Sequence, residues 1–249
     1  MIRWILVMFL TLAACRADPP DAPAEAAPPA PAAYTVISVE EPGEVTGVVR
    51  YAGAIDDAPV TVDRDQATCA SAGRGPSGAL MVTDGKVANA VVEVVGVREG
   101  MGFETQRVRI DNVGCVFVPR VALARTGDTF VSHNSDPVFH NAKLEQQRGA
   151  RTKRIANLPV PLQNTDSPGR VLDKPGVVTV SCDAHLWMRS TVYVTDHPYA
   201  TLTDSEGRFA IQGLPPGDYT LKVWHEVLGE RTAPVTVQPG APANADLAL

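Results

Sequence analysis

The apolar residues of this chain occur mostly in short runs rich in Val, Ile, Thr and Phe, which are separated by Gly, Pro and Asp. Runs of this kind are typical of strands bounded by turns. Helical periodicity is weak, and the one segment that could form a helix, 143–156, is charged and has no clear apolar stripe. The pattern therefore predicts an all-β protein, a sandwich or a barrel. The expected strands are 45–51, 87–97, 106–110, 129–132, 177–181, 191–195, 208–211 and 219–224.

The N-terminus has a different pattern, which is typical of a secretory signal. Arg3 is followed by an apolar run of nine residues from Trp4 to Leu12, too short to span a bilayer but suited to a signal peptide. Residues 12–15, Leu-Ala-Ala-Cys, resemble a bacterial lipobox. The resemblance implies cleavage after a signal peptide at 1–14 and acylation of Cys15, whose acyl chains suffice for stable anchoring. The alternative is an ordinary signal peptide with an incidental cysteine.

Residues 15–33 predict a tether between this anchor and the folded part. Residues 16–33 contain six prolines and eight alanines, a composition that cannot bury a core and favours a semi-rigid, partly polyproline-II chain. We therefore expect a location in the bacterial cell envelope, on the periplasmic side. Arg16 stands where an aspartate would indicate retention in the inner membrane, so the outer membrane is favoured.

Composition and charge limit the partners that this chain is expected to have. The 249 residues are 45% hydrophobic, enough for one large or two small domains. With 22 Lys and Arg against 28 Asp and Glu, the net charge is −6. Because nucleic-acid binding depends on neutralising phosphates with Lys and Arg, no nucleic-acid partner is expected. Contact with a membrane is expected through the lipid anchor only.

The strongest chemical signal is a set of potential metal ligands. Cys182, His185 and Met188 follow a hydrophobic strand at the spacing Cys-x2-His-x2-Met, and His140 lies in an upstream segment that can supply a second imidazole. Two His, one Cys and a weak axial Met are the ligands of blue-copper electron-transfer sites. Zinc gains little from a thioether. The pattern therefore predicts one copper ion that cycles between Cu(I) and Cu(II).

The remaining cysteines predict a disulfide. Acylation would use Cys15 and copper would use Cys182, which leaves Cys69 and Cys115 as the plausible pair in an oxidising compartment.

Around these ligands the sequence resembles the cupredoxins. The resemblance covers about residues 104–197 and includes Gly127-Asp-Thr, Asn134-Ser-Asp and the loop from Cys182 to Met188, whose short spacing is similar to that of amicyanin. It implies a Greek-key sandwich with copper held near one end. It also implies that Asn141 hydrogen-bonds near the thiolate and ties the two ligand loops. Leu186 stands where such loops usually carry proline, and its amide is expected to donate to the sulfur and raise the reduction potential.

The C-terminal part resembles a different module. Residues 203–223, Thr-Asp-Ser-Glu-Gly-Arg-Phe through to Val, are similar to the carboxypeptidase regulatory-like domain, a transthyretin-like sandwich, and residues 204–207 are expected to close a hairpin. The segments 43–51 and 88–97 look like the opening strands of the same domain. We therefore predict that a cupredoxin domain (104–197) is inserted between the two parts, 34–103 and 198–249, of one transthyretin-like domain. The alternative is two sandwiches in tandem.

Three functions are consistent with this sequence. The full ligand set favours a one-electron carrier that docks transiently on redox protein partners. The alternatives are a copper-binding carrier or buffer that transfers the metal itself, and an envelope interaction module whose copper is structural. Four filled ligand positions leave no evident place for a substrate, so we expect a protein that is not an enzyme. No peptidase motif is evident.

Overall fold

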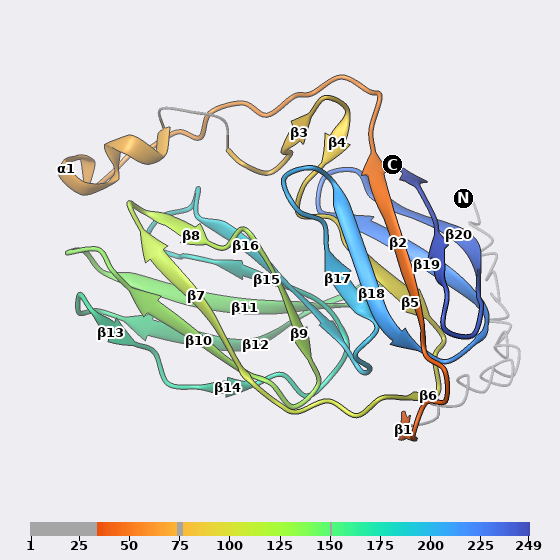
Figure 1. Ribbon diagram of the computed structural model, residues 1–249. Coiled ribbons are helices and arrows are strands. Elements are labelled where there is room, and N and C mark those ends of the chain that lie inside the picture. The colour runs from red at the N-terminus through yellow and green to blue at the C-terminus, as the bar shows by residue number, and fades with distance from the viewer. Residues whose placement is uncertain (1–33, 74–76, 150) are drawn as a thin grey trace, which may run out of the picture. The chain divides into compact units, whose positions relative to one another are not determined.

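The computed structural model describes residues 34–73, 77–149 and 151–249 (Figure 1). The proposed lipobox, Cys15 and the tether lie outside these residues. Within the described part of the chain, no helix is long and apolar enough to cross a membrane. The expectation of an all-β fold is confirmed, because strands arranged in open sheets form most of the structure.

Ten strands from the middle of the sequence form what we call the central sandwich, β7–β16. One sheet has the order β13-β10-β7-β8, with β14 also paired to β10. Its strands are β7 (Arg107–Val113), β8 (Val116–Val118), β10 (Thr129–Asn134), β13 (Thr165–Asp166) and β14 (Arg170–Val171). The facing sheet has the order β12-β11-β15-β16-β9. Its strands are β9 (Val121–Arg125), β11 (His140–Arg148), β12 (Arg151–Val160), β15 (Gly176–Ser181) and β16 (Arg189–Thr195).

The chain on either side of these strands forms the flanking sandwich. Its first sheet has the order β17-β5-β19-β20. These strands are β5 (Val91–Val95), β17 (Ala200–Leu202), β19 (Gly217–His225) and β20 (Gly229–Val237). Its second sheet has the order β18-β2-β4-β3, and β21 and β22 also pair with β2. These strands are β2 (Gly43–Arg50), β3 (Val82–Thr83), β4 (Lys86–Val87), β18 (Arg208–Leu214), β21 (Pro242–Asn244) and β22 (Leu247–Ala248).

Strand pairing therefore connects distant parts of the chain. β2 pairs with β18 and β5 pairs with β19, so strands from before the central sandwich complete sheets with strands from after it. A short parallel pair, β1 (Thr35–Val36) with β6 (Glu99–Gly100), lies near the end of the N-terminal part. The connection between β2 and β3 contains α1 (Gln66–Cys69) and the 3-10 turn η1 (Ala70–Gly73), as Figure 1 shows.

Alternation of buried and exposed residues explains most of these strands, but β16 is an exception. In β2 every second residue is buried, as expected for a strand that covers a core on one face only. All residues of β16 after Arg189 are buried. Val192 and Val194 face the core of the central sandwich, whereas Tyr193 packs between the two sandwiches with Val91 and Val121. β16 is thus covered on both faces.

The structure settles one open possibility about local structure and corrects one expectation. Residues 143–148 and 151–156, the one segment that could have formed a helix, lie in the paired strands β11 and β12. Ala142, Leu144 and Gln146 are buried in alternation, but the polar Gln146 hides this period in the sequence. Gln146 can be buried because its amide nitrogen donates a hydrogen bond to the carbonyl of Lys174. The turn at 204–207 is present, with Gly207 at φ 66°, but it connects β17 and β18, which belong to different sheets.

Candidate metal centre

The candidate ligands converge because two neighbouring strands begin and end at the same end of one sheet. His140 is the first residue of β11, and Cys182 directly follows β15. These two strands pair in antiparallel register, with Lys143 opposite Ser181, so the start of one lies beside the end of the other. His185 follows in the loop between β15 and β16, three residues after Cys182.

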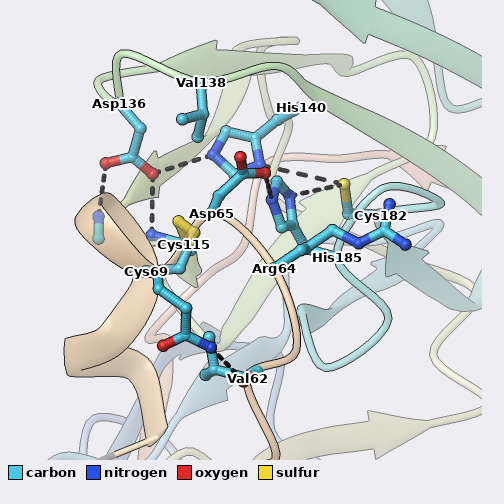
Figure 2. Close-up of a disulfide and its surroundings, with 12 residues drawn as sticks. Val62, Arg64, Asp65, Cys69, Cys115, Asp136, Val138, His140, Cys182 and His185 are labelled. Atoms are coloured by element: carbon cyan, nitrogen blue, oxygen red, sulfur yellow. Dashed lines mark hydrogen bonds and ion pairs between the residues drawn. A yellow bond between two sulfur atoms is a disulfide. The ribbon is translucent and has the colours of Figure 1, made fainter.

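The three side chains form a buried cluster of nitrogen and sulfur atoms. The Nδ1 atom of His185 lies 3.7 Å from the Cys182 Sγ atom, and the Nδ1 atom of His140 lies 4.0 Å from it. The two imidazole rings have their centroids 4.6 Å apart. Cys182 is 1% exposed and both histidines are 0% exposed. Figure 2 shows both rings directed toward the sulfur.

A carboxylate holds the far nitrogen of each imidazole. The Nε2 atom of His140 lies 3.0 Å from Asp136 Oδ2, and the Nε2 atom of His185 lies 2.8 Å from Asp65 Oδ2. An ionised carboxylate only accepts hydrogen bonds, so each Nε2 carries the proton and each Nδ1 keeps its lone pair. Both lone pairs are therefore free on the side that faces Cys182. Burial lowers the pKa of His140 below its ordinary value, although the Asp136 hydrogen bond opposes this effect.

Asp136 connects His140 to the turn between β7 and β8. Its carboxylate accepts the backbone amides of Gly114 at 2.6 Å and Cys115 at 2.8 Å while it contacts His140. The turn residue Cys115 has a left-handed backbone, φ 60°, and its sulfur is joined to that of Cys69 in a disulfide. The disulfide thus lies next to the candidate ligands, as Figure 2 shows, and the Sγ atoms of both cysteines lie within 4.8 Å of a ring nitrogen of His185.

Asn141 ties the two ligand loops together. The Cys182 thiol donates to Asn141 Oδ1 at 3.4 Å, and the backbone amide of Asp183 donates to the same oxygen at 2.9 Å. The Asn141 amide nitrogen in turn donates to Asn157 and Asp183. Lys143, whose ammonium group lies 2.6 Å from Asp183, lowers the pKa of that carboxyl group. The side chain after the first histidine thus fixes the backbone after the cysteine.

The other residues of the loop differ in their surroundings. Met188 is buried, and its amide donates to the His185 carbonyl at 2.9 Å, which closes a tight turn between the two residues. Trp187 packs edge-on against the His185 ring, with centroids 5.0 Å apart, and its indole N–H donates to the Cys115 carbonyl. The Leu186 side chain is 69% exposed. In the described part of the chain, the expected hydrogen bond from the Leu186 amide to Cys182 Sγ is absent.

These atoms fit a soft or borderline transition-metal ion. Sulfur and nitrogen atoms that bind one ion at about 2.3 and 2.0 Å are roughly 3.5–4 Å apart, depending on the angle between them. The separations of 3.7 and 4.0 Å agree with this spacing. Thiolate and imidazole are also the donors that Cu(I), Cu(II) and zinc prefer. With two carboxylates behind the imidazoles, the charge of the site is complementary to a cation.

Sequence reasoning missed Asp65 and Asp136. Asp136 lies four residues before His140, and its position in the Asn-Ser-Asp segment was the only local signal for it. Asp65 lies 120 residues before His185 in a segment with no strand pattern, so no sequence spacing connects the two. The nearest residue with a predicted role is Cys69, four positions after Asp65, which is expected to pair with Cys115.

Comparison with known proteins identifies one part of the chain. Residues 169–249 match the family model of the carboxypeptidase regulatory-like domain. This match covers less than half of the chain. It includes the strands β17–β22 of the flanking sandwich, but also β14–β16, which pair within the central sandwich. No curated protein matches the sequence.

Solved structures similar to this chain include copper proteins. A copper-containing nitrite reductase from Thermus scotoductus is 21% identical over 41% of this chain and 25% of its own, with a TM-score of 0.31. A purple cupredoxin from Nitrosopumilus maritimus is 20% identical over 36% and 99%, with a TM-score of 0.30. Amicyanin from Paracoccus versutus is 16% identical over 35% and 80%, with a TM-score of 0.28. The chain spans about a quarter of the length of the nitrite reductase.

Proposed function

We propose that this chain is a periplasm-facing type 1 copper protein that carries single electrons between redox partners. The observation that carries the proposal is the buried Cys182 thiol with two imidazole Nδ1 atoms at 3.7 and 4.0 Å, each directed toward it by a carboxylate on Nε2. His140, Cys182 and His185 would hold the ion, and Met188 would be the weak axial ligand. When bound there, copper supplies a one-electron couple between Cu(I) and Cu(II).

The protein supports this role by fixing its ligands before the ion binds. Asn141 holds the Cys182 thiol, Asp136 holds His140, and the turn closed by the Met188 amide shapes the ligand loop. Such outer contacts orient metal ligands and keep their geometry. A site that rearranges little between oxidation states suits electron transfer. The burial of all four candidate ligands also keeps substrates away from the ion, which favours a carrier over an enzyme.

The N-terminal sequence supports a location for this carrier in the bacterial cell envelope. A lipid on Cys15, followed by the Pro- and Ala-rich tether of residues 16–33, would hold the folded part at the periplasmic side of the envelope. The tether would let the metal centre reach redox proteins that are themselves membrane-bound or soluble. We propose transient protein partners for this reason, without contact between the folded part and the lipid.

A redox titration of the copper-loaded full-length protein tests the function. We expect reversible uptake of one electron per chain, retention of the ion through repeated cycles, and loss of this behaviour in Cys182→Ser. The control is Ser181→Ala, a buried neighbour whose hydroxyl has no hydrogen-bond partner among the described residues. Transfer of the ion to a chelator upon reduction would contradict an electron carrier and favour a copper carrier. An ion that stays bound but does not change oxidation state would favour a structural role.

A further inference from the structure

A segment of the flanking chain lies over the candidate metal centre. Residues 60–73, between β2 and β3, include α1 and η1, and we call them the cap. Val62 packs against the core of the central sandwich. Asp65 contacts His185, and Cys69 is bonded to Cys115. Figure 2 shows Asp65 and the disulfide on the side of the two imidazoles away from Cys182.

The cap is connected to the ligand loop by two routes, one through the β7–β8 turn and one direct. The disulfide joins it covalently to the β7–β8 turn. The carbonyl of Cys115, in that turn, accepts the indole N–H of Trp187 at 2.9 Å, and Trp187 packs on the His185 ring. The second route is direct, because the Asp65 carboxylate accepts the His185 Nε2–H. The cap, the turn and the ligand loop thus form one connected unit around His185.

The backbone of Asp65 is arranged for this contact. The residue has φ 48° and ψ 40°, a left-handed conformation that aspartate tolerates better than most residues. Its carbonyl accepts the amides of Thr68 and Cys69, at 2.9 and 2.8 Å, so the same residue starts the turn that leads to the disulfide. Asp65 keeps 45% of its side chain exposed, whereas His185 is fully buried. Asp65 therefore stands between His185 and solvent.

We propose that residues 60–73 are a covalently fastened cap that shields the metal centre, and that Asp65 is a positioning residue for His185. The positioning role rests on the proposed function, because it concerns His185 as a metal ligand. Asp65 holds the imidazole proton on Nε2, so Nδ1 faces Cys182. Its negative charge also favours the more positive of two oxidation states at the site. The disulfide keeps the cap closed over His185, and the His185 ring lies between Asp65 and Cys182.

Shielding is measurable without any metal. In the apo protein, Cys182 reacts with a small alkylating reagent only when the structure around it opens. We would follow the alkylated Cys182 peptide by mass spectrometry in wild type, in Cys69→Ser combined with Cys115→Ser, and in Asp63→Asn. Asp63 is an exposed residue of the cap that pairs with Arg64, so its variant is the matched control.

We expect alkylation of Cys182 to be roughly tenfold faster or more in the double variant and unchanged in Asp63→Asn. Circular dichroism confirms that both variants remain folded. Equal rates in wild type and the double variant would overturn the cap. The alkylation rate does not depend on copper, so it tests the cap even if the chain binds no metal. Failure to bind metal would refute the proposed function and leave the cap as it is.

The positioning role has its own readout. In the copper-loaded protein, Asp65→Asn keeps an acceptor of similar shape but removes the charge, so the reduction potential should shift to a more positive value. Asp65→Ala should also weaken retention of the ion, because it removes the acceptor that keeps the His185 proton on Nε2. Asp63→Asn should leave the potential where it is. A potential that Asp65→Asn leaves unchanged or lowers would overturn the positioning role.

Discussion

A buried glutamate at the junction of the two sandwiches offers a quantitative test of the structure. Glu93, on β5 of the flanking sandwich, accepts the Tyr193 hydroxyl of β16 at 2.7 Å. Its carboxylate also lies 2.7 Å from the Lys222 ammonium and 3.6 Å from His197 Nε2. Only 13% of the Glu93 side chain is exposed. The perturbation is Glu93→Gln, which keeps the size of the side chain and removes its charge.

The size of the effect follows from the pKa of Glu93. Burial alone would raise this pKa, but the nearby His197 imidazole, the close contacts with Lys222 and Tyr193 and the charge of Lys222 outweigh burial and lower the pKa from 4.5 to about 2. A carboxyl group whose pKa is lower in the folded state stabilises the fold when ionised. The difference corresponds to about 3 kcal/mol of unfolding free energy at neutral pH. This stabilisation is present above the unfolded-state pKa and is lost as the pH falls toward 2.

The assay is urea unfolding of wild type and Glu93→Gln at several values between pH 7 and pH 3. The difference in unfolding free energy should contain a pH-dependent part of about 3 kcal/mol at pH 7, which falls to about half by pH 3. Glu104→Gln, at an exposed position, is the control and should show no such dependence. A difference between wild type and Glu93→Gln that stays constant over this range would refute the reasoning.

Three further predictions concern the disulfide, the ligand loops and the anchor. Replacing both Cys69 and Cys115 by serine should lower the unfolding free energy by about 4 kcal/mol on the chain-entropy model, which urea unfolding measures; an unchanged midpoint would contradict it. Asn141→Ala should weaken Cu(II) affinity by about 10–100-fold in a competition titration, because Cys182 loses its hydrogen-bond partner; equal affinity would exclude this role. Cys15→Ser should interrupt lipoprotein processing, and a chain that starts near Tyr34 should be soluble in membrane fractionation; wild-type protein that salt alone removes from membranes would show that no lipid is attached.

The sequence pattern predicted the class of fold because most strands cover one core and alternate with period two. It failed where a buried polar residue interrupts the pattern, as Gln146 does in the β11–β12 hairpin. It also could not separate the two faces of β16, whose residues are buried on both sides by two different cores. Such burial depends on a second sandwich, which periodicity within one strand does not contain.

The candidate site was predictable to the extent that its chemistry is local. Cys182, His185 and Met188 lie in one loop, so their spacing alone indicates a metal site. His140 required the additional assumption that its strand neighbours β15, which the structure shows. The contact between Asp65 and His185 joins residues 120 positions apart and depends on how the cap folds. Contacts of this kind follow from tertiary structure and have no signature in a single sequence.

The visible absorption spectrum of the Cu(II)-loaded full-length protein tests the central claim most directly. A Cys182 thiolate bound to Cu(II) predicts an intense blue or green colour from charge transfer. Cys182→Ala should abolish this band, whereas Met188→Leu should shift it without removing it, since the thioether is the weak ligand. A colourless wild-type protein with one Cu(II) ion per chain confirmed by metal analysis would contradict the account.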